Sequence, residues 1–412
     1  MNKQDYKIHI IGAGISGLIA AQVLEDHGFT PIIIEATNTV GGRVKTDIID
    51  NYSLDHGFQV LLTAYPAAQK YLNFKALNLE YFLPGAAIFK NEKQVTIGDP
   101  LRNLSLLIPT LTAGIGTFKD KLKILKLNKL LKNKSLEAIF STKETTTLKY
   151  LKAFGFTEPI IIDFFKPFFS GIFLEDTLET SSRMFEFVYK MFGEGYAALP
   201  QKGIGEIPKQ LQSKLTKTTF KFNTKVAAVN NNKIELENKE TINSDFVIIA
   251  TDAGPLISNL KQQTCHWHSC ETLYFETNKP VINKNLIGLI PKQNSLINNI
   301  YYHTNKADKN LLSVTVVNQQ DLSNSTLIEQ VEQELEKYCN IKTNRFIKQY
   351  SIPMALPKLN GLEYEMSPSE TRLKTNVFLA GDTLLNGSLN AAMISGECAA
   401  LGVVETITEH KS

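Results

Sequence analysis

The sequence has little of several features that would restrict its class. Its four cysteines, Cys265, Cys270, Cys339 and Cys398, are scattered and show no disulfide framework. This usage is typical of a reducing compartment, so we expect a cytoplasmic protein. The formal net charge of +3 is too small to indicate binding to nucleic acid.

Long apolar runs are also missing. The longest one after the N-terminal region, residues 159–174, is short and is interrupted by Asp163 and Lys166, so it predicts no membrane-spanning helix. No small-residue cleavage pattern follows the apolar N-terminal stretch, and we expect no signal peptide. A chain of 412 residues with 43% apolar residues predicts two domains with substantial cores.

What is present begins with three glycines near the N-terminus. Gly12, Gly14 and Gly17 follow the apolar run 8–11 and precede a helical pattern, and Glu35 ends the next apolar run. Strand, glycine turn, helix, strand and acid together form the dinucleotide-binding fingerprint. The glycines permit a tight turn, close approach of a pyrophosphate and helix–strand packing. The helix N-terminus favours phosphate, and Glu35 is placed to accept hydrogen bonds from a ribose.

Two further elements separate flavin from nicotinamide. Gly41 and Gly42 let the chain pass close to a ligand, and Arg43 offers a fork of donors for phosphate. Far downstream, an apolar strand ends in Gly381 and Asp382, whose carboxylate could bind ribityl hydroxyls. The small-residue helix start that follows would allow close packing beside a flavin ring.

With these motifs the chain resembles the flavin amine oxidase, phytoene desaturase and protoporphyrinogen oxidase superfamily. Residues 199–208, 245–251, 55–60 and 168–173 are similar to further stretches of that group, in a desaturase-like branch. The resemblance implies FAD and covers nearly the whole chain. Because no cysteine stands beside Gly381-Asp382 in the sequence, we expect the FAD to be bound non-covalently.

The fingerprint and the resemblance together predict a set of cofactor-binding residues, without assigning catalytic residues or a metal site. The predicted residues are Gly12, Ala13, Gly14, Ile15, Ser16, Gly17, Glu35, Ala36, Gly41, Gly42, Arg43, Gly57, Phe58, Val226, Ala250, Thr251, Gly381, Asp382, Ser388, Leu389 and Ala392. Among them, Val226 lies in a segment whose backbone could contact adenine.

The order of the motifs predicts an α/β fold in which a Rossmann-like FAD-binding domain is interleaved with an α+β substrate domain. Residues 1–75, 190–255 and 345–412 would form the first domain, and residues 76–189 and 256–344 the second. Within the second domain, we expect mostly helices before residue 190, with strands and a closing helix, residues 326–338, after residue 256.

Two segments of the second domain allow more than one interpretation. The cysteines and histidines of residues 265–270 suggest zinc, but in a strand Cys265 faces away from the others, so an edge strand is favoured. Residues 101–140 hold eight Lys or Arg against two acids. On a helical wheel Phe118 falls opposite Leu127, which indicates packing by the protein on both sides; peripheral contact with the inner face of a membrane is the alternative.

Aromatic residues give a further candidate for the substrate site. The cluster Phe164, Phe165, Phe168, Phe169 and Phe173 is at helical spacing, which favours a core, although some rings could line an apolar channel. For His56, beside Gly57, a structural role is favoured over acid–base work.

We therefore predict an FAD-dependent oxidoreductase that takes a hydride from a substrate C–H, because the flavin carries this chemistry and no other catalytic set is evident. The first expectation is desaturation of a small, apolar, isoprenoid-like substrate. Amine oxidation or porphyrinogen oxidation is the alternative, and a flavoprotein with structural FAD and a binding module is an alternative of another class. The sequence leaves the oligomeric state open.

Overall fold

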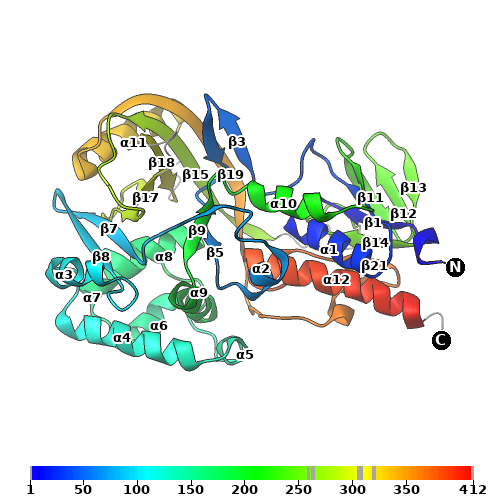
Figure 1. The fold of residues 1–412 in the computed structure, drawn as a ribbon, viewed down its shortest axis with the longest axis horizontal. Coiled ribbons are helices and arrows are strands. Elements are labelled where there is room, and N and C mark those ends of the chain that lie inside the picture. Colours follow the sequence, from blue (N-terminus) through cyan, green and yellow to red (C-terminus); the bar gives the residue numbers. More distant parts are fainter. Residues whose placement is uncertain (1, 258–259, 261–264, 304–309, 318–321, 410–412) are drawn as a thin grey trace.

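The protein consists of two lobes, and both chain termini lie at the outer end of one of them (Figure 1). The computed structural model describes residues 2–257, 260, 265–303, 310–317 and 322–409. The lobe that carries the termini is called the nucleotide lobe here, and the other is called the substrate lobe.

A six-stranded sheet with the order β10-β2-β1-β14-β21-β20 forms the centre of the nucleotide lobe. Its strands are β1 (Ile8–Ile11), β2 (Ile32–Ile34), β10 (Thr219–Lys221), β14 (Phe246–Ile249), β20 (Arg372–Lys374) and β21 (Val377–Leu379). All pairs are parallel except β20 with β21 at the edge. All four residues of β1 and of β14 are buried, as expected for parallel strands covered on both faces. This arrangement confirms the predicted α/β class.

Each face of this sheet has its own cover. Helices α1 (Ile15–Asp26) and α12 (Leu389–Glu409) pack on one face, and α10 (Glu206–Lys214) contacts α1. The other face packs against an antiparallel sheet of β11 (Val226–Asn230), β12 (Lys233–Leu236) and β13 (Thr241–Asn243). Of the described helices, only α12 is long and apolar enough to cross a membrane, but 67% of its apolar window is buried, as in a core helix.

The substrate lobe contains a seven-stranded sheet with the order β19-β15-β18-β17-β16-β7-β8. Its strands are β7 (Gly85–Lys90), β8 (Lys93–Gly98), β15 (His266–Thr277), β16 (Ile287–Leu289), β17 (Ile297–Tyr302), β18 (Leu311–Val316) and β19 (Thr343–Lys358). One face packs on α11 (Asn324–Cys339), and Leu273, Val331 and Leu335 belong to the buried cluster between them. The opposite face is directed towards the helices of the same lobe, where α8 contacts β17.

These helices follow one another between residues 104 and 194 and form the lower part of the substrate lobe (Figure 1). They are a 3-10 turn (Leu104–Leu106), α3 (Leu107–Thr112), α4 (Phe118–Asn133), α5 (Leu136–Phe140), α6 (Thr147–Phe154), α7 (Glu158–Ile160), a π-helical turn (Ile161–Phe165), α8 (Lys166–Phe173) and α9 (Ser182–Glu194). Side-chain caps begin several of them. Thr117, for example, forms a reciprocal capping box with Asp120 at the start of α4.

Short elements join the two lobes. They are the hairpin β3 (Thr46–Ile49) and β4 (Tyr52–Asp55), the small sheet of β5 (Leu61–Leu62), β9 (Ala197–Pro200) and β6 (Leu79–Tyr81), and helix α2 (Pro66–Tyr71). Further 3-10 turns span Lys3–Asp5, Pro368–Thr371 and Asp382–Leu384.

The structure differs from the expected segment boundaries in two places. The predicted return to the nucleotide domain at residue 345 falls inside β19, which pairs with β15 in the substrate-lobe sheet until Lys358. The block expected to be mostly helical begins with β6, β7 and β8, and β7 pairs in parallel with β16. In both places, pairing between strands far apart in the sequence decides to which lobe a segment belongs.

The expected packing of residues 118–133 was wrong for one side of the helix. Leu127 and Leu131 of α4 are buried, but Phe118, Leu122 and Leu125 on the opposite side are 68%, 51% and 42% exposed. The wheel identified the two apolar sides correctly. Whether protein covers the second side depends on neighbouring elements, which the wheel does not contain.

Asp55 joins the β3–β4 hairpin to the turn that precedes α10. Its buried carboxylate accepts hydrogen bonds from Thr46 Oγ1 at 2.5 Å and from the backbone N–H of Ile204 at 3.0 Å. Burial raises the pKa of Asp55 to about 7, although both hydrogen bonds oppose this rise. Asp55 is therefore held in a place that favours its protonated form.

We predict that Asp55→Asn removes a pH-dependent part of the stability. A carboxyl group whose pKa is raised on folding binds its proton more tightly in the folded state, so its contribution falls as the pH rises from about 4 to about 7. Between these values the wild type should lose stability relative to Asp55→Asn by at most about 1.4 kcal/mol per pH unit. Urea denaturation of both proteins across this range measures the difference, and a constant difference would contradict the prediction.

Candidate functional site

The first glycine turn connects β1 to α1 and leaves free space in front of the helix. Gly12 has a φ of +102°, and a Cβ there would lie 2.9 Å from the carbonyl oxygen of Ala250. A Cβ on Gly17 would lie 2.1 Å from the carbonyl oxygen of Gly12, so helix and strand pack without a side chain between them. Gly14 caps α1, and a Cβ built on it would meet no atom within 4 Å. The turn therefore offers the helix N-terminus to a ligand at Gly14.

The second glycine pair lies directly against the first turn. The N–H of Gly41 donates to the carbonyl oxygen of Ala13 at 2.9 Å, and a Cβ on Gly42, whose φ is +60°, would lie 3.3 Å from the Cα of Gly14. Glu35 lies at the same rim, where it accepts from the N–H of Ala13 at 2.8 Å and from the N–H and hydroxyl of Thr37. These bonds leave acceptor capacity on the carboxylate, which has about four lone-pair sites.

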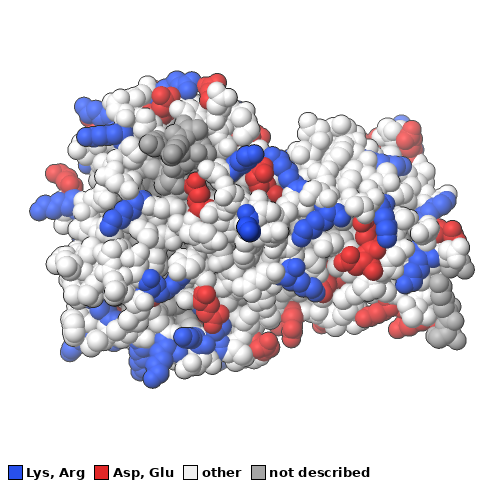
Figure 2. All heavy atoms as spheres, viewed as in Figure 1, with Lys and Arg blue, Asp and Glu red and all other residues white. Residues whose placement is uncertain are grey.

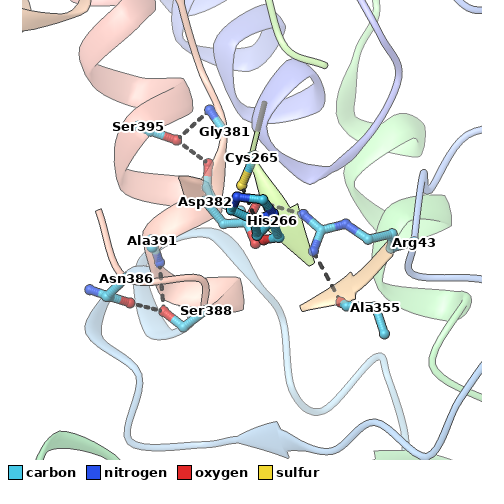
Figure 3. Close-up of polar contacts among 11 residues, drawn as sticks. Arg43, Cys265, His266, Ala355, Gly381, Asp382, Asn386, Ser388, Ala391 and Ser395 are labelled. Atoms are coloured by element: carbon cyan, nitrogen blue, oxygen red, sulfur yellow. Dashed lines mark hydrogen bonds and ion pairs between the residues drawn. The ribbon is translucent and has the colours of Figure 1, made fainter. Parts of the chain in front are cut away.

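The C-terminal strand brings Asp382 to the same place. Arg43 Nη2 lies 2.5 Å from Asp382 Oδ1, and Arg43 Nη1 donates to the carbonyl oxygen of Ala355 at 3.3 Å (Figure 3). The N–H of Gly381 donates to Ser395 Oγ at 2.9 Å. An ion pair thus connects residues that are 339 positions apart in the sequence. In this structure the Arg43 guanidinium contacts a carboxylate, whereas the sequence suggested a phosphate partner.

The start of α12 is fixed by side chains at the same site. Ser388 Oγ accepts from the N–H of Ala391 at 3.0 Å and donates to Asn386 Oδ1 at 2.7 Å, as Figure 3 shows. Ser388 therefore satisfies one of the free N–H groups of the first helical turn. The remaining positive end of α12 lies beside the Arg43–Asp382 pair.

A cavity of about 1750 Å³ connects these elements with the substrate lobe. This volume exceeds the range of about 300 to 1,000 Å³ that is typical of a site for one drug-sized ligand. The cavity extends from Gly12 and Asp382 in the nucleotide lobe to Phe168 and Leu122 in the helical part. It therefore has room for a large cofactor at one end and a second molecule at the other.

Most of the predicted cofactor-binding residues line this cavity. They are Gly12, Gly14, Ile15, Ser16, Glu35, Gly41, Gly42, Arg43, Gly57, Phe58, Ala250, Thr251, Gly381, Asp382, Ser388, Leu389 and Ala392. Four others do not line it: Ala13, Gly17 and Ala36 lie beside lining residues in the chain, and Val226 is buried between the two sheets of the nucleotide lobe. Contacts with FAD stay predictions for these four residues and for those that line the cavity.

Several other lining residues had no functional role predicted from the sequence. Trp267, the single tryptophan of the chain, lies with its ring 5.1 Å from the Arg43 guanidinium carbon. In β19, residues 351–358 all line the cavity. The signal in the sequence was the position of Trp267 between His266 and His268, in the segment that we considered only for zinc binding. For β19 no local motif exists, because its position comes from pairing with β15.

The five phenylalanines of residues 164–173 contribute both to the core and to the cavity wall. Phe165, Phe169 and Phe173 are buried in the core, and Phe164 and Phe168 are half-buried. All of these except Phe165 line the cavity. The rings therefore form an apolar wall that is also part of the core.

His56 takes part in a polar network at the cavity. Its Nε2 lies 2.9 Å from Asp47 Oδ2, to which the hydroxyl of Tyr350 donates at 2.8 Å, and the His56 and Tyr350 rings stack at 4.3 Å. Burial raises the pKa of Asp47, but the hydrogen bonds from His56 and Tyr350 outweigh it and lower the pKa overall. This network fixes the His56 ring, which is the structural role that the sequence favoured.

The segment with two cysteines enters the sheet as β15, the second strand from the edge. Over residues 266–270 it pairs with β19, and its pairing with β18 begins at Glu271. Residues 266–270 therefore have a paired strand on one side only, whereas residues 271–276 of β15 are paired on both sides. Within the described part of the chain, no group of three or more His, Cys, Asp or Glu residues could hold a metal ion.

Two of the cysteines line the cavity. Burial raises the pKa of Cys270 to about 12, so its thiol is neutral at pH 7. Figure 3 places Cys265 beside Asp382, and burial together with Asp252 and Asp382 raises its pKa, against the effect of Arg43. No cysteine is close to Asp382 in the sequence. The fold brings Cys265 beside it, and the raised pKa favours the neutral thiol.

Comparison with known proteins agrees with this geometry. A family model described as flavin containing amine oxidoreductase matches residues 15–404. Hydroxysqualene dehydroxylase from Sinorhizobium fredii is 38% identical over 80 residues, which is 19% of each chain. The first curated relatives are matched over 7% to 32% of their own length.

Two solved structures have the same fold over nearly their whole length. A protein from Exiguobacterium sp. 255-15, assigned as a protoporphyrinogen oxidase, superposes with a TM-score of 0.71 at 16% identity, covering 99% of this chain and 100% of that one. Cyclohexylamine oxidase from Brevibacterium oxydans IH-35A gives 0.70 at 13%, covering 98% and 99%.

The fold and the site thus define a protein of the FAD-binding class, with two lobes around a shared cavity. The chain belongs to the flavin containing amine oxidoreductase family. Its residues fit the cofactor, because a Cβ would fill the space in front of Gly14 and because Glu35 and Asp382 place carboxylates where hydroxyl groups of FAD could donate. The resemblance inferred from the sequence is confirmed.

We predict that Gly14→Val abolishes FAD binding without unfolding the protein. Gly14 has extended backbone geometry, with φ −71° and ψ 179°, and open space around it, so valine fits the apoprotein but occupies the place of the pyrophosphate. The ratio of flavin to protein absorbance after purification measures binding, and thermal unfolding of both apoproteins is the control. A variant that keeps FAD as tightly as the wild type would show that the fingerprint is misassigned.

A milder loss is expected for Asp382→Ala. It removes a charge-assisted acceptor and also leaves Arg43 without its carboxylate partner, so the affinity for FAD should fall by a factor corresponding to about 1.5–3 kcal/mol. Fluorescence titration of the apoprotein with FAD gives the dissociation constant. Arg43→Gln and the double variant complete a mutant cycle, and an unchanged affinity in Asp382→Ala would exclude a contact with the cofactor.

Proposed function

We propose that this oxidoreductase takes a hydride from a C–H bond of a lipophilic, isoprenoid-like substrate and introduces a double bond. The observation that carries this proposal is the apolar character of the cavity in the substrate lobe. FAD, when bound, supplies the acceptor for the hydride. The chain's own residues bind the substrate, orient its carbon chain and exclude water.

Apolar side chains from three directions surround the expected substrate position. Phe164, Phe168 and Phe173 form the wall described above, Met184 and Val188 come from α9, and Ile352 comes from β19. Such a surface favours a ligand with little polar surface, because each buried apolar contact replaces contact with water. These apolar walls offer a hydrocarbon contact along its length, which a compact polar molecule would not use.

The β15 strand provides the second argument. Amine oxidases of the superfamily that the chain resembles carry a lysine on a substrate-domain strand, five residues before an aromatic residue. Aligned on residues 270–275, Cys270 takes the place of this lysine five residues before Phe275, and it pairs with Ile352 of β19. The neutral Cys270 thiol cannot supply the positive charge of a lysine beside a reduced flavin. Of the two lysines that could replace it if the alignment slipped, Lys279 is exposed and does not line the cavity, and Lys261 lies outside the described residues.

Amine oxidation is the second candidate, because the carboxylates of Glu144, Glu175 and Glu179 also line the cavity. These groups would attract an ammonium ion. Glu175 accepts hydrogen bonds from the N–H groups of Thr177 and Thr180, which fix its carboxylate on its own loop, and the cavity also holds the cations Lys121 and Lys149, which would repel an ammonium ion. We therefore favour the lipophilic substrate.

We predict that simple primary amines and polyamines do not reduce the flavin, whereas an isoprenoid does. The measurement is anaerobic titration of the purified holoprotein with carotenoid precursors, porphyrinogens and amines, with bleaching of the flavin absorbance as the readout. Cys270→Ala tests whether Cys270 occupies the position of the amine-oxidase lysine. Lys279→Met and Lys261→Met test whether one of these lysines occupies that position instead. Rapid bleaching by an amine that survives Cys270→Ala but is lost in a lysine variant would overturn both the alignment and the proposal.

Acid precipitation of the same holoprotein should release all of the flavin. The cysteines that approach the cavity, Cys265 and Cys270, have raised pKa values and are poor nucleophiles. Absorbance of the supernatant and of the pellet measures the partition. A yellow pellet that turns colourless in Cys265→Ala would show a covalent bond from the one thiol that lies beside Asp382.

A further inference from the structure

Exposed apolar side chains gather on one end of the substrate lobe. Nine of the fourteen large hydrophobic side chains that are exposed in the described chain fall within residues 101–130, and they define what is called the apolar patch here. Its members are Leu101, Leu104, Leu107, Ile108, Leu111, Phe118, Leu122, Leu125 and Leu130. A cluster of this kind is unusual on a soluble surface and marks an interaction site.

Helical spacing explains how the patch forms. Leu104, Ile108 and Leu111 recur at intervals of four and three residues, as do Phe118, Leu122 and Leu125 of α4. The side chain of Lys121 joins the two segments, because its Nζ donates to the carbonyl oxygen of Leu111 at 3.1 Å. The two helical segments therefore hold their apolar sides at one end of the lobe, far from the chain termini (Figure 1).

Lysines surround the apolar side chains of α4. Between Phe118 and Asn133 there are six lysines and one acid, Asp120, which is buried as part of the helix cap. No described ion pair neutralises these six lysines. Figure 2 shows basic side chains gathering over the region where Figure 1 places α4. The patch therefore combines apolar contact area with uncompensated positive charge.

The patch is continuous with the cavity. Leu107, Leu111, Phe118, Leu122 and Leu125 belong to the patch and also line the cavity. Phe164 and Phe168 line the same cavity, which also reaches the nucleotide lobe at Gly12 and Asp382. The patch and the apolar wall of the cavity therefore share these five side chains.

We propose that the apolar patch docks on the surface of an anionic lipid bilayer, so that the cavity opens towards the lipid. Apolar side chains enter the headgroup boundary, and the lysines of α4 contact acidic headgroups, as in interfacial amphipathic helices. A second copy of this chain fits less well. A twofold dimer through the same patch would bring two sets of lysines together, and like charges repel. The docking proposal does not depend on the identity of the substrate.

Vesicle flotation of the holoprotein tests the proposal. The probes are vesicles of pure phosphatidylcholine and vesicles with equal parts of phosphatidylcholine and phosphatidylglycerol, at low and high salt. We expect flotation with the acidic vesicles and at least about tenfold weaker binding to the neutral ones, with the difference reduced at high salt.

Two pairs of substitutions locate the contact. Leu104→Ser with Ile108→Ser changes side chains that are 81% and 73% exposed and do not line the cavity, so fold and flavin content should remain. Lys119→Gln with Lys129→Gln removes two charges from exposed positions of α4. Each pair should weaken binding to acidic vesicles about tenfold or more.

The controls match each change elsewhere on the surface. Ile48→Ser alters an apolar side chain that is 65% exposed in the β3–β4 hairpin, and Lys225→Gln with Lys342→Gln removes the same net charge far from α4. Both should float like the wild type. Flotation that is equal for all variants, or an oligomer in solution that only the Leu104/Ile108 variant dissociates, would overturn the proposal. Flavin bleaching by substrates in solution is measured separately, so failure of docking and failure of the proposed function are distinguishable.

Discussion

The close contact between the first and the last helix is the constraint on which the rest of this structure depends. A Cβ on Gly396 of α12 would lie 2.3 Å from the carbonyl oxygen of Ser16 of α1, so the two helices touch backbone to backbone. Gly17 brings α1 equally close to the turn after β1. Because no side chain separates these elements, the start of α12 lies beside the first glycine turn. The Arg43–Asp382 pair and the Ser388 cap occupy the space that this contact creates.

The two ends of the cavity differ in polarity because different kinds of elements form them. Its nucleotide half is made from turns and helix starts, where backbone N–H groups and a few carboxylates are available. Its substrate half is made from sheet and helix faces, where side chains decide the character, and these are mainly leucine, isoleucine and phenylalanine. A cofactor held by polar contacts can thus present its reactive ring to an apolar chamber, which excludes water from the reaction.

Helix α4 shows how one element can belong to the core, the cavity and the surface. Leu127 and Leu131 anchor it in the fold, and Leu122 and Leu125 lie both at the cavity and at the protein surface. A soluble protein would normally cover such a side, because exposed apolar area costs free energy in water. Its retention next to a cavity entrance agrees with delivery of a lipophilic substrate from a lipid phase.

The sequence by itself determined the features that depend on local geometry. Gly12, Gly14, Gly17 and Glu35 have the spacing of a strand, a glycine turn, a helix and a second strand, so a dinucleotide cofactor and the α/β fold could be predicted from them. Tertiary structure alone decided where distant segments meet. Asp382 reaches Arg43 because β21 pairs with β14, and residues 345–358 join the substrate lobe because β19 pairs with β15. The exposure of Phe118 also belongs to this second group, since a helix pattern identifies apolar sides but not the element, if any, that covers them.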